Sequence, residues 1–409
     1  MLCYIFLMDR IYFDHAATTP LDKRVLDAML PYFMEKFGNP SSILIEEGEA
    51  PHNAVEDARR SVAKLINAEH EEIIFTGSAT ESNNLAVKGL ALANKDKGKR
   101  ILFSDIEHFS IMNQADFLRS LGFEVDFVKV DNYGVIDLED LKKKVTDDTA
   151  LVAVMHANLE IGTIEPIGEI ASFLKERGVL LHTDGTGTCG RIPVDVKGLG
   201  VDTMTISPHQ FYGPKGVAAL YLKRGTRLTS LIQGGFQEMG YRAGTENVPG
   251  IVGFGEASRI ALEEMDERVK RLTSLSRRLW DGLAASIEYL HFTGHPAKRL
   301  PGHVSFWIEF VEGESLLLWL NLNRIASASG SACASNMSAV DETGLKASHV
   351  LTAVGVPAEI CNGSIAFSLG KDNIMEEVEH TLSVIPGIVK RLRDMSPLYE
   401  DFKNRTKTA

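Results

Sequence analysis

The middle of this 409-residue chain alternates between two hydrophobic periodicities. Short apolar runs of strand length and composition lie at residues 72–75, 101–104, 150–155 and 179–182. Helix-like stretches separate them, for example residues 82–92 and 167–177. Parallel strands need long crossover connections, usually helices, so this order predicts a mostly parallel sheet covered by helices on both faces. The sequence therefore predicts an α/β fold.

The pattern changes near Gly253. A long charged amphipathic stretch, residues 257–287, leads into a second region with its own strands at residues 304–307 and 365–368 and with helices at its C-terminal end. We therefore expect a large α/β domain followed by a smaller α+β domain. At roughly 150 residues per domain, the length leaves room for both.

The overall charge is acidic, with 55 acidic against 43 basic residues and a formal net charge of −12. A nucleic-acid-binding protein normally has a net basic balance or a strong basic stripe, so we expect no nucleic-acid partner. No segment approaches 18 uninterrupted apolar residues, so we expect no membrane span. The apolar start, residues 1–7, has neither a basic region before it nor a small-residue cleavage site, which argues against a secretory signal.

Four cysteines are spread over the chain without CxxC or Cys/His spacing, namely Cys3, Cys189, Cys333 and Cys361. This excludes a disulfide-stapled secreted fold and a zinc ribbon, and it fits a reducing cytoplasm, which is the localisation that we expect. Cys333 lies among small residues, 327–335, where a thiol is sterically open and more often reactive than structural. A chance surface cysteine is the alternative.

Two segments place polar groups at the ends of predicted strands. Residues 75–85 run from a strand through small and hydroxyl residues into a helix, which points backbone N–H groups at an anion and adds Thr80 and Ser82 as donors. An ordinary N-capped helix is the alternative. Asp184 ends an apolar strand at the edge where open α/β sheets bind ligands, although a lone acid there is as often a cap.

A glycine motif next to Asp184 resembles a dinucleotide-binding motif but does not predict one. Residues 185–190 match GxGxxG, but a dinucleotide fingerprint needs a helix to start within the glycines. Residues 191–195 instead have the composition of another short strand, in which Pro193 blocks a helix. We therefore do not expect a nicotinamide dinucleotide. The many glycines of residues 234–247 predict a loop whose backbone approaches a neighbour closely.

Several short motifs follow one another in a specific order. They are DHAATTP at 14–20, NPSS at 39–42, ATESNN at 79–84, EH at 107–108, EIGT at 160–163, His209 followed by GPKG at 213–216, RAGT at 242–245 and SGSAC at 329–333. With these motifs the chain resembles the cysteine desulfurases, the NifS/IscS-like sulfur donors of iron–sulfur cluster assembly, over about residues 11–400. Such enzymes take sulfur from L-cysteine, leave alanine and hold a persulfide on a loop cysteine.

The resemblance implies the fold type I architecture of pyridoxal 5'-phosphate (PLP) enzymes, in which the large domain has a mostly parallel seven-stranded sheet. We expect this domain over residues 17–256 and a small C-terminal α+β domain, carrying the Cys333 loop, over residues 257–409. Residues 1–16 are expected to pack with the small domain, and residues 1–7 to be a misassigned start or a disordered stub. The implied partners are a second copy, in a homodimer with sites at the subunit interface, and an iron–sulfur scaffold protein.

The resemblance also implies roles for single residues. The cofactor's phosphate would be held by the turn with Ala79 and by Thr80, Ser207 and His209, with Thr245 reaching it from the partner subunit. Asp184 would pair with the pyridinium nitrogen, His108 would stack on the ring and assist proton transfer, and Cys333 would attack the substrate sulfur. As an alternative, His108 satisfies a core hydrogen bond. No metal ligand is implied, apart from Cys333 as a ligand of a transient iron–sulfur cluster.

The departures from the family pattern concern the cofactor and the substrate. The lysine expected after His209 is Gln210, and an amide can neither form the internal Schiff base nor shuttle a proton as an amine does. Lys215 belongs to the GPKG turn and is not expected to replace this lysine. The other departures put apolar residues at positions expected to hold Asn, Gln, Arg and His, namely Leu159, Gly187, Ala366 and Leu44.

Three hypotheses follow. In the first, which we favour, the protein is a cysteine-desulfurase homologue of iron–sulfur assembly in which ordinary PLP catalysis is impaired, and Cys333 carries persulfide or ligates a cluster. In the second, it is an active desulfurase with noncovalently held PLP and another base. In the third, it is a PLP-fold enzyme with different chemistry or a non-catalytic partner subunit.

Overall fold

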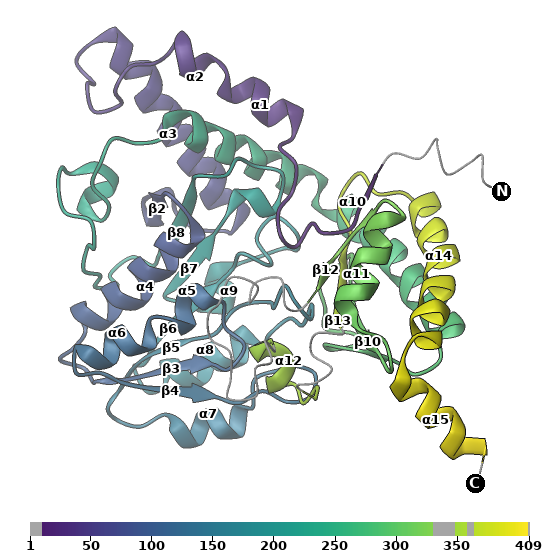
Figure 1. Cartoon of the computed structure of the whole chain (residues 1–409). Coiled ribbons are helices and arrows are strands. Elements are labelled where there is room, and N and C mark those ends of the chain that lie inside the picture. The colour runs from purple at the N-terminus through teal and green to yellow at the C-terminus, as the bar shows by residue number, and fades with distance from the viewer. Residues whose placement is uncertain (1–9, 330–347, 358–363, 408–409) are drawn as a thin grey trace.

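The computed structural model describes residues 10–329, 348–357 and 364–407 of the chain. Figure 1 shows a large body of sheet and helices and, beside it, a smaller body that the long helix α10 (Val248–Ser286) joins to it. None of the described helices is long and apolar enough to cross a lipid bilayer. Cys333 lies outside the described residues, so the prediction that it sits on a reactive loop stays a prediction.

The large body is built on a seven-stranded sheet in the order β2-β8-β7-β6-β5-β3-β4. Its strands are β2 (Ile73–Thr76), β3 (Arg100–Ser104), β4 (Glu124–Val128), β5 (Thr149–Ala153), β6 (Leu180–Asp184), β7 (Thr203–Ile206) and β8 (Ala218–Leu222). Strands β3 to β7 are parallel to one another, and β8 runs antiparallel to both of its neighbours. The predicted mostly parallel sheet of seven strands is confirmed.

Helices cover both faces of this sheet. One layer is formed by α3 (Glu46–Leu65), α7 (Leu138–Lys144), α8 (Ile167–Lys175), α9 (Val196–Leu199) and α10, and the other by α4 (Ala79–Ala93), α5 (Phe109–Met112) and α6 (Ala115–Ser120). On β3, Leu102 belongs to the first core, whereas its neighbours Ile101 and Phe103 belong to the second. Successive residues of a strand point to opposite faces, so apolar residues at every position explain why both faces are covered.

The smaller body contains an antiparallel sheet in the order β12-β13-β10-β9. Its strands are β9 (Leu290–Phe292), β10 (His303–Ile308), β12 (Ala328–Ser329) and β13 (Ser364–Ser368), and its helices are α11 (Gly313–Leu322), α14 (Met375–Asp394) and α15 (Pro397–Lys407). Strands β10 and β13 correspond to the two strands predicted in this region. The short helix α12 (His349–Ala353) packs instead on the large body, where Val350 and Leu351 join Ile106 and Ile161 in a small core.

The N-terminal strand β1 (Ile11–Tyr12) pairs in parallel with β11 (Ile325–Ala326) of the smaller body. The chain then crosses to the large body with α1 (Lys23–Met29) and α2 (Pro31–Met34).

Helix α10 belongs to both bodies. Its buried residues up to Met265 lie in the core of the large body, and those from Leu275 onward lie in the core of the smaller one. The predicted boundary between residues 256 and 257 falls within this helix, and the domain limits stay a prediction.

Short 3-10 turns join several of these elements, namely η1 (His70–Glu72), η2 (Pro208–Gln210) and η3 (Gln237–Gly240). The strand expected at residues 191–195 does not form, and this prediction is wrong. Pro193 has no N–H to give to a ladder. The side chain of Arg191 is turned inward to hydrogen-bond the carbonyl oxygens of Gln210 and His15.

A buried ion pair fixes η3 against the large body. The two guanidinium nitrogens Nη1 and Nη2 of Arg59 lie 2.7 and 2.8 Å from the carboxylate oxygens of Glu238, and both side chains are buried. Glu238 also accepts a hydrogen bond of 2.7 Å from the backbone N–H of Phe75, on β2. Glu238 has a positive φ of 47°, a strained conformation for a residue with a Cβ, so these contacts must hold the turn in place.

The substitution Glu238→Ala should lower the free energy of unfolding by about 1–3 kcal/mol, because it removes the buried bidentate partner of Arg59 and leaves this charge with the partly exposed Glu56 alone. Chemical denaturation of the purified chain measures this change. The matched control is Asp281→Ala, which removes an exposed partner of Arg277 at 2.9 Å and should cost less than about 1 kcal/mol. Equal, small effects of both substitutions would contradict the structural role given to Glu238.

Candidate active site

A cavity of about 540 Å³ opens where the carboxyl ends of β6 and β7 meet the N-terminal ends of α4 and α5. Open α/β sheets bind ligands at this edge. Of the predicted site residues, the structure brings together Ala79, Thr80, His108, Asp184, Ser207 and His209, along with the substituted positions Leu159, Gly187 and Gln210. Thr245, Leu44 and Ala366 do not line this cavity. The role of Thr245 in a partner subunit therefore stays a prediction.

Asp184 lies at the end of β6 and is 5% exposed. One carboxylate oxygen accepts a hydrogen bond of 2.7 Å from Nδ2 of Asn83, and the other accepts one of 2.9 Å from the backbone N–H of Thr186. Within the described part of the chain, no lysine, arginine or histidine forms an ion pair with this carboxylate. A buried acid that lines a cavity without a cation is suited to a ligand that brings a positively charged N–H group.

His108 caps the start of α5 and leaves its ring exposed to the cavity. The backbone N–H of Ser110 donates to Nδ1 at 3.1 Å, and the Ser110 hydroxyl lies 2.8 Å from the same atom. In the neutral ring the proton therefore sits on Nε2. This ring is not buried in a core, so the geometry favours a role toward a ligand over the alternative of a core hydrogen bond.

One end of the cavity is suited to an anion. Ser78 caps the 15-residue helix α4 by accepting from the backbone N–H of Glu81 at 3.1 Å, and Ala79 and Thr80 form the first turn. Helix N-termini attract anions because their first N–H groups are unpaired and the helix dipole is positive there. Ser207, His209 and Lys215 line the same cavity.

The amide of Gln210 is held in the cavity wall by a clamp that the sequence does not predict. Its Oε1 accepts a hydrogen bond of 2.6 Å from Nη2 of Arg191, and its Nε2 donates to the carbonyl oxygen of Ala16 at 2.9 Å. Arg191 also donates to the carbonyl oxygens of His15 and Gln210. Burial lowers the pKa of Arg191 to about 10, so it stays charged at neutral pH. We call Arg191, Gln210 and the Ala16 carbonyl the Gln210 clamp.

Two of the substituted positions touch each other. A Cβ added to Gly187 would lie 2.8 Å from the carbonyl oxygen of Ala157 and 3.5 Å from Cδ2 of Leu159. A side chain at residue 187 would therefore have to displace the Ala157 backbone, whereas it would be in ordinary contact with Leu159. Leu159 and Gly187 make this wall of the cavity apolar.

Ala366 lies on β13, opposite Ser305 of β10 and Ala328 of β12. It is 5% exposed and supplies no charge. Among the described residues that line the cavity, Lys215 is the single lysine or arginine, and it lies in the turn after η2. The described lining of the cavity therefore contains no arginine that could clamp a substrate carboxylate in a bidentate manner.

Two buried glutamates and a histidine line the cavity without having been assigned a role from the sequence. Burial raises the pKa of Glu160 to about 8, so this carboxyl is protonated near pH 7, and burial also raises the pKa of Glu107 well above its ordinary value. His349 opens α12, where its Nε2 lies 3.0 Å from the Glu107 carbonyl oxygen and its ring centroid 4.8 Å from that of Phe109. In the sequence, Glu107 and Glu160 are marked only by their places in the EH and EIGT motifs, and His349 is marked only by its place after the Cys333 segment.

Comparison with known proteins gives one consistent family. The model of the class-V aminotransferase family matches residues 11–380. The chain is 46% identical over 398 residues to the cysteine desulfurase IscS of Dictyoglomus turgidum, covering 97% of this chain and 99% of that one. It is 47% identical over 388 residues to the cysteine desulfurase IscS of Methanosarcina thermophila, covering 95% and 94%.

Solved structures agree with these relatives. A NifS-like protein superposes with a TM-score of 0.85 at 37% identity, over 93% of this chain and 99% of that chain. SspA in complex with cysteine superposes with a TM-score of 0.77 at 31% identity, over 89% of this chain and all (100%) of that one. The predicted fold type and the resemblance stated from the motifs are confirmed.

The substitution Glu160→Gln should change how stability depends on pH. The folded chain keeps a proton on Glu160 up to a pKa of about 8, whereas the unfolded chain releases it near the ordinary value of 4.5. The free energy of unfolding therefore falls as pH rises from about 5 to about 8, by up to about 1.4 kcal/mol per pH unit for this one proton. Urea denaturation at pH 6.5, 7.5 and 8.5 should show a flatter dependence in the variant.

Glu176→Gln is the matched control, because the side chain of Glu176 is 78% exposed and should leave the wild-type slope unchanged. Parallel curves for the wild type and Glu160→Gln would show that Glu160 is ionised in the folded chain.

Proposed function

Because the chain belongs to the class-V aminotransferase family of PLP-dependent enzymes, we propose that it is a cysteine desulfurase-type protein of iron–sulfur cluster assembly with impaired PLP catalysis. In this proposal Cys333 still carries sulfur as a persulfide. The observation that carries the proposal is the Gln210 clamp. An amide whose oxygen and nitrogen are both engaged in the wall occupies the place at which the family pattern puts the cofactor's lysine.

The residues present fit the noncovalent part of the cofactor. Asp184 is suited to the pyridinium nitrogen, because it is buried and has no cation of its own in the described chain. The phosphate would be held by Thr80, Ser207 and His209 at the anion-binding end. When bound, PLP supplies an electron sink for amino-acid chemistry. Gln210 does not fit the covalent part, because an amide is no nucleophile toward an aldehyde.

The substrate side of the site is altered as well. The carboxylate of L-cysteine would have no arginine partner at position 366, where this chain has Ala366. A hydrogen bond to a charged group typically contributes about 1.5–3 kcal/mol. Leu159 and Gly187 replace two polar side chains by an apolar contact. The protein is therefore expected to bind L-cysteine poorly and to deprotonate it poorly.

Cys333 does not depend on this chemistry. A thiolate can take up sulfane sulfur from a persulfide, R–S–SH, by forming Cys333–S–SH and releasing R–S⁻. The sulfur would then pass to an iron–sulfur scaffold protein. In an alternative form of this proposal, the Cys333 thiolate binds iron and thereby ligates a cluster.

The second candidate is an active cysteine desulfurase that holds PLP noncovalently. Asp184 and the retained anion-binding end favour it. His108 could then move the proton, since its Nε2 is the protonated nitrogen of the neutral ring and its ring lines the cavity. The third candidate is a non-catalytic partner subunit. It would be favoured if sulfur uptake did not require Cys333.

Purified protein with PLP, L-cysteine and a thiol reductant should form no alanine above the background of a reaction without protein, because position 210 offers no amine. The same protein treated with a low-molecular-weight persulfide should gain one sulfur on the Cys333 peptide in a mass spectrum. Cys333→Ala should lose this sulfur. Cys189→Ala is the matched control and should keep it, since Cys189 is 1% exposed and burial raises its pKa to about 12.

The Gln210→Lys variant shows whether the Gln210 amide alone prevents alanine formation. Its activity should remain far below that of an ordinary desulfurase, because Leu159, Gly187 and Ala366 are unchanged. Alanine formed by the wild type and lost in Cys333→Ala would overturn the first proposal in favour of the second.

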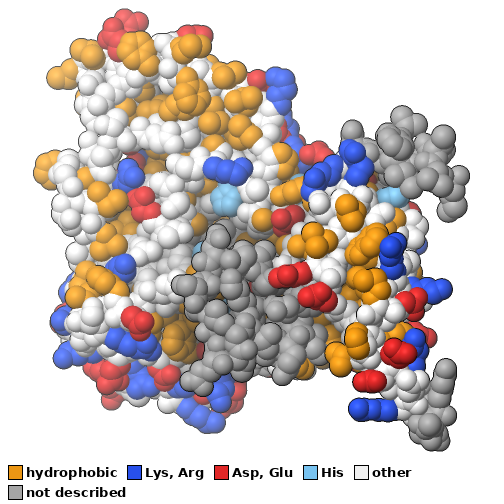
Figure 2. All heavy atoms as spheres, in the orientation of Figure 1, with side chains coloured by type: hydrophobic (Ala, Val, Ile, Leu, Met, Phe, Trp, Pro, Cys, Tyr) orange, Lys and Arg blue, Asp and Glu red, His pale blue; other side chains and the backbone are white. Residues whose placement is uncertain are grey.

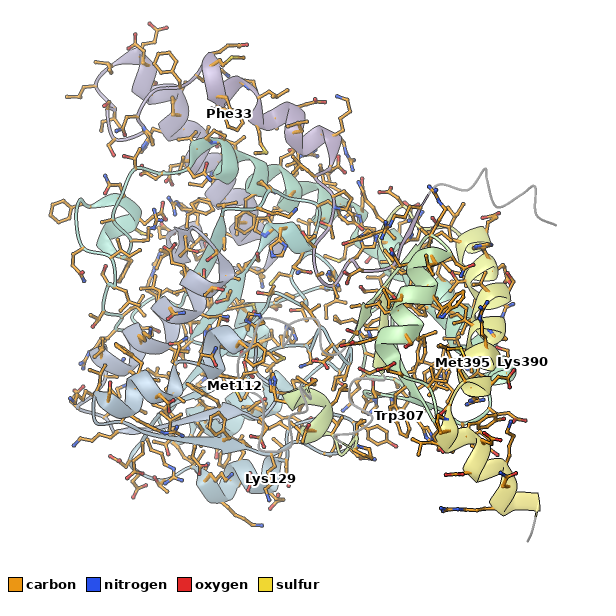
Figure 3. The ribbon with its side chains drawn as sticks, viewed as in Figure 1. Phe33, Met112, Lys129, Trp307, Lys390 and Met395 are labelled. Carbon is orange, nitrogen blue, oxygen red and sulfur yellow. The ribbon has the colours of Figure 1, made fainter. Side chains whose placement is uncertain are left out.

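A second copy of this chain is the partner that the surface of the large body supports. Apolar side chains gather over α1 and α2 in Figure 2, and Phe33 is labelled on this edge in Figure 3. The most exposed apolar residues of this region and of η3 are Met34 at 79%, Phe37 at 70%, Leu44 at 95% and Phe236 at 93%. Contiguous exposed apolar surface usually marks a protein interface. We infer a homodimer through this surface, in which the rigid η3 turn meets the partner.

The double substitution Met34→Asp and Phe236→Asp should convert the dimer into a monomer, because it places two charges in the apolar interface. Size-exclusion chromatography with light scattering reports the mass directly. Leu398→Asp on α15 is the matched control, since Leu398 is also exposed, at 68%, but lies on the smaller body. A dimer that survives the double substitution would contradict this interface.

A further inference from the structure

The clamp offers no amine for a covalent tether at position 210, so in the proposed function the ligand is retained by noncovalent contacts. In the cavity wall, the Gln210 side-chain oxygen accepts a hydrogen bond from Arg191, and its amide nitrogen donates to the carbonyl oxygens of Ala16 and Ala17. Leu159 and Gly187 form an apolar wall. Asp184 and the anion-binding end are the polar contacts suited to a pyridinium nitrogen and to a phosphate.

The charge at the anion-binding end comes from one residue. Burial lowers the pKa of His209, and the neighbouring charges of Lys215 and Arg191 lower it further, so His209 is neutral at pH 7. Burial also lowers the pKa of His349, which lines the cavity elsewhere. Arg242 lies near α4 but is paired with Glu81 at 2.9 Å. Lys215 is thus the one lysine or arginine among the described residues that line the cavity.

The turn that carries Lys215 is held on both sides. The N–H of Gly213 donates to the carbonyl oxygen of Pro208 at 2.8 Å, and the carbonyl oxygen of Gly216 accepts from Nδ2 of Asn247 at 3.1 Å. Tyr212, just before the turn, is anchored by its N–H to the hydroxyl of Thr19 at 2.7 Å. The Lys215 backbone is therefore fixed, while its side chain is exposed and forms no ion pair in the described chain.

From this geometry we propose that Lys215 is a ligand-binding residue that holds the phosphate of a noncovalently bound, aromatic phosphate monoester and replaces the retention that a Schiff-base lysine would supply. The inference rests on the proposed function for the nature of the ring, whereas the phosphate contact depends only on the cavity. A phosphate dianion carries more charge than a helix N-terminus of about half a unit can balance, and Lys215 supplies the missing positive charge.

The test compares binding of PLP, and its competition by inorganic phosphate, by equilibrium dialysis of the full-length chain freed of ligand. Lys215→Gln should weaken PLP binding about 10- to 100-fold, the range typical of a lost charge-assisted hydrogen bond. Inorganic phosphate should also compete less well with PLP in this variant. Lys215→Arg should restore most of the affinity. Lys223→Gln is the matched control, because it removes the same charge from the same body but lies outside the cavity and pairs with Asp202.

Measuring Lys215→Gln in the Gln210→Lys background separates a role of Lys215 in ligand retention from a purely structural role. A covalent tether there should make the loss caused by Lys215→Gln smaller than about threefold, so the two substitutions should be strongly non-additive. Circular dichroism and the thermal midpoint of each variant show that it is folded. If Gln210→Lys does not fold, the comparison of Lys215→Gln with Lys215→Arg and Lys223→Gln decides.

Wild-type affinity in Lys215→Gln would overturn the inference, as would an equal loss in both backgrounds or a wild type that binds no PLP. None of these outcomes changes whether Cys333 takes up sulfur. Alanine formation by the wild type would overturn the proposed function and would leave the Lys215 result standing.

Discussion

A largely buried guanidinium that has no acid partner in the described chain is the constraint on which the candidate site depends. Arg191 is charged, and in the described chain it bonds only to neutral oxygens, those of the Gln210 side chain and of the His15 and Gln210 backbone. A second cation at residue 210 would meet it at contact distance, whereas an amide accepts its hydrogen bond. The same amide ties the N-terminal segment to the turn after β7 through Ala16. Position 210 therefore contributes to structure here, and the neutral residue is part of a satisfied network.

The other departures from the family pattern fit this view of a site that has been rebuilt in part. Leu159 and Gly187 are neighbours in the apolar wall of the cavity. Asp184 and the start of α4 keep the features that suit a pyridine ring and a phosphate. Among the described residues, the cavity lacks the lysine and arginine expected to act on an amino acid and contains the groups expected to hold a cofactor. Sulfur handling by Cys333 needs only an accessible thiolate, which separates it from the altered chemistry.

The sequence predicts the sheet, its covering helices and the position of Asp184, because periodicity and strand ends are local signals. Thr80 and His108 follow from the family motifs and lie in the same cavity. The Gln210 clamp is not predicted, because Arg191 lies in a stretch that has the composition of a strand and its role depends on a side chain that turns inward. The proximity of Leu159 and Gly187 is not predicted either, because only the folded sheet brings their two loops together. Lys215 is dismissed as a turn residue, since only the structure shows that its turn faces the cavity.

The central claim is that this chain holds its cofactor without a covalent bond. The most direct measurement is the intact mass of the purified full-length protein after incubation with PLP, removal of unbound PLP by gel filtration and reduction with borohydride, which makes a Schiff base permanent. The account predicts the mass of the unmodified chain, with the cofactor removed by denaturation. A chain heavier by one reduced pyridoxyl phosphate group would show that a lysine elsewhere forms the bond, and it would contradict the claim.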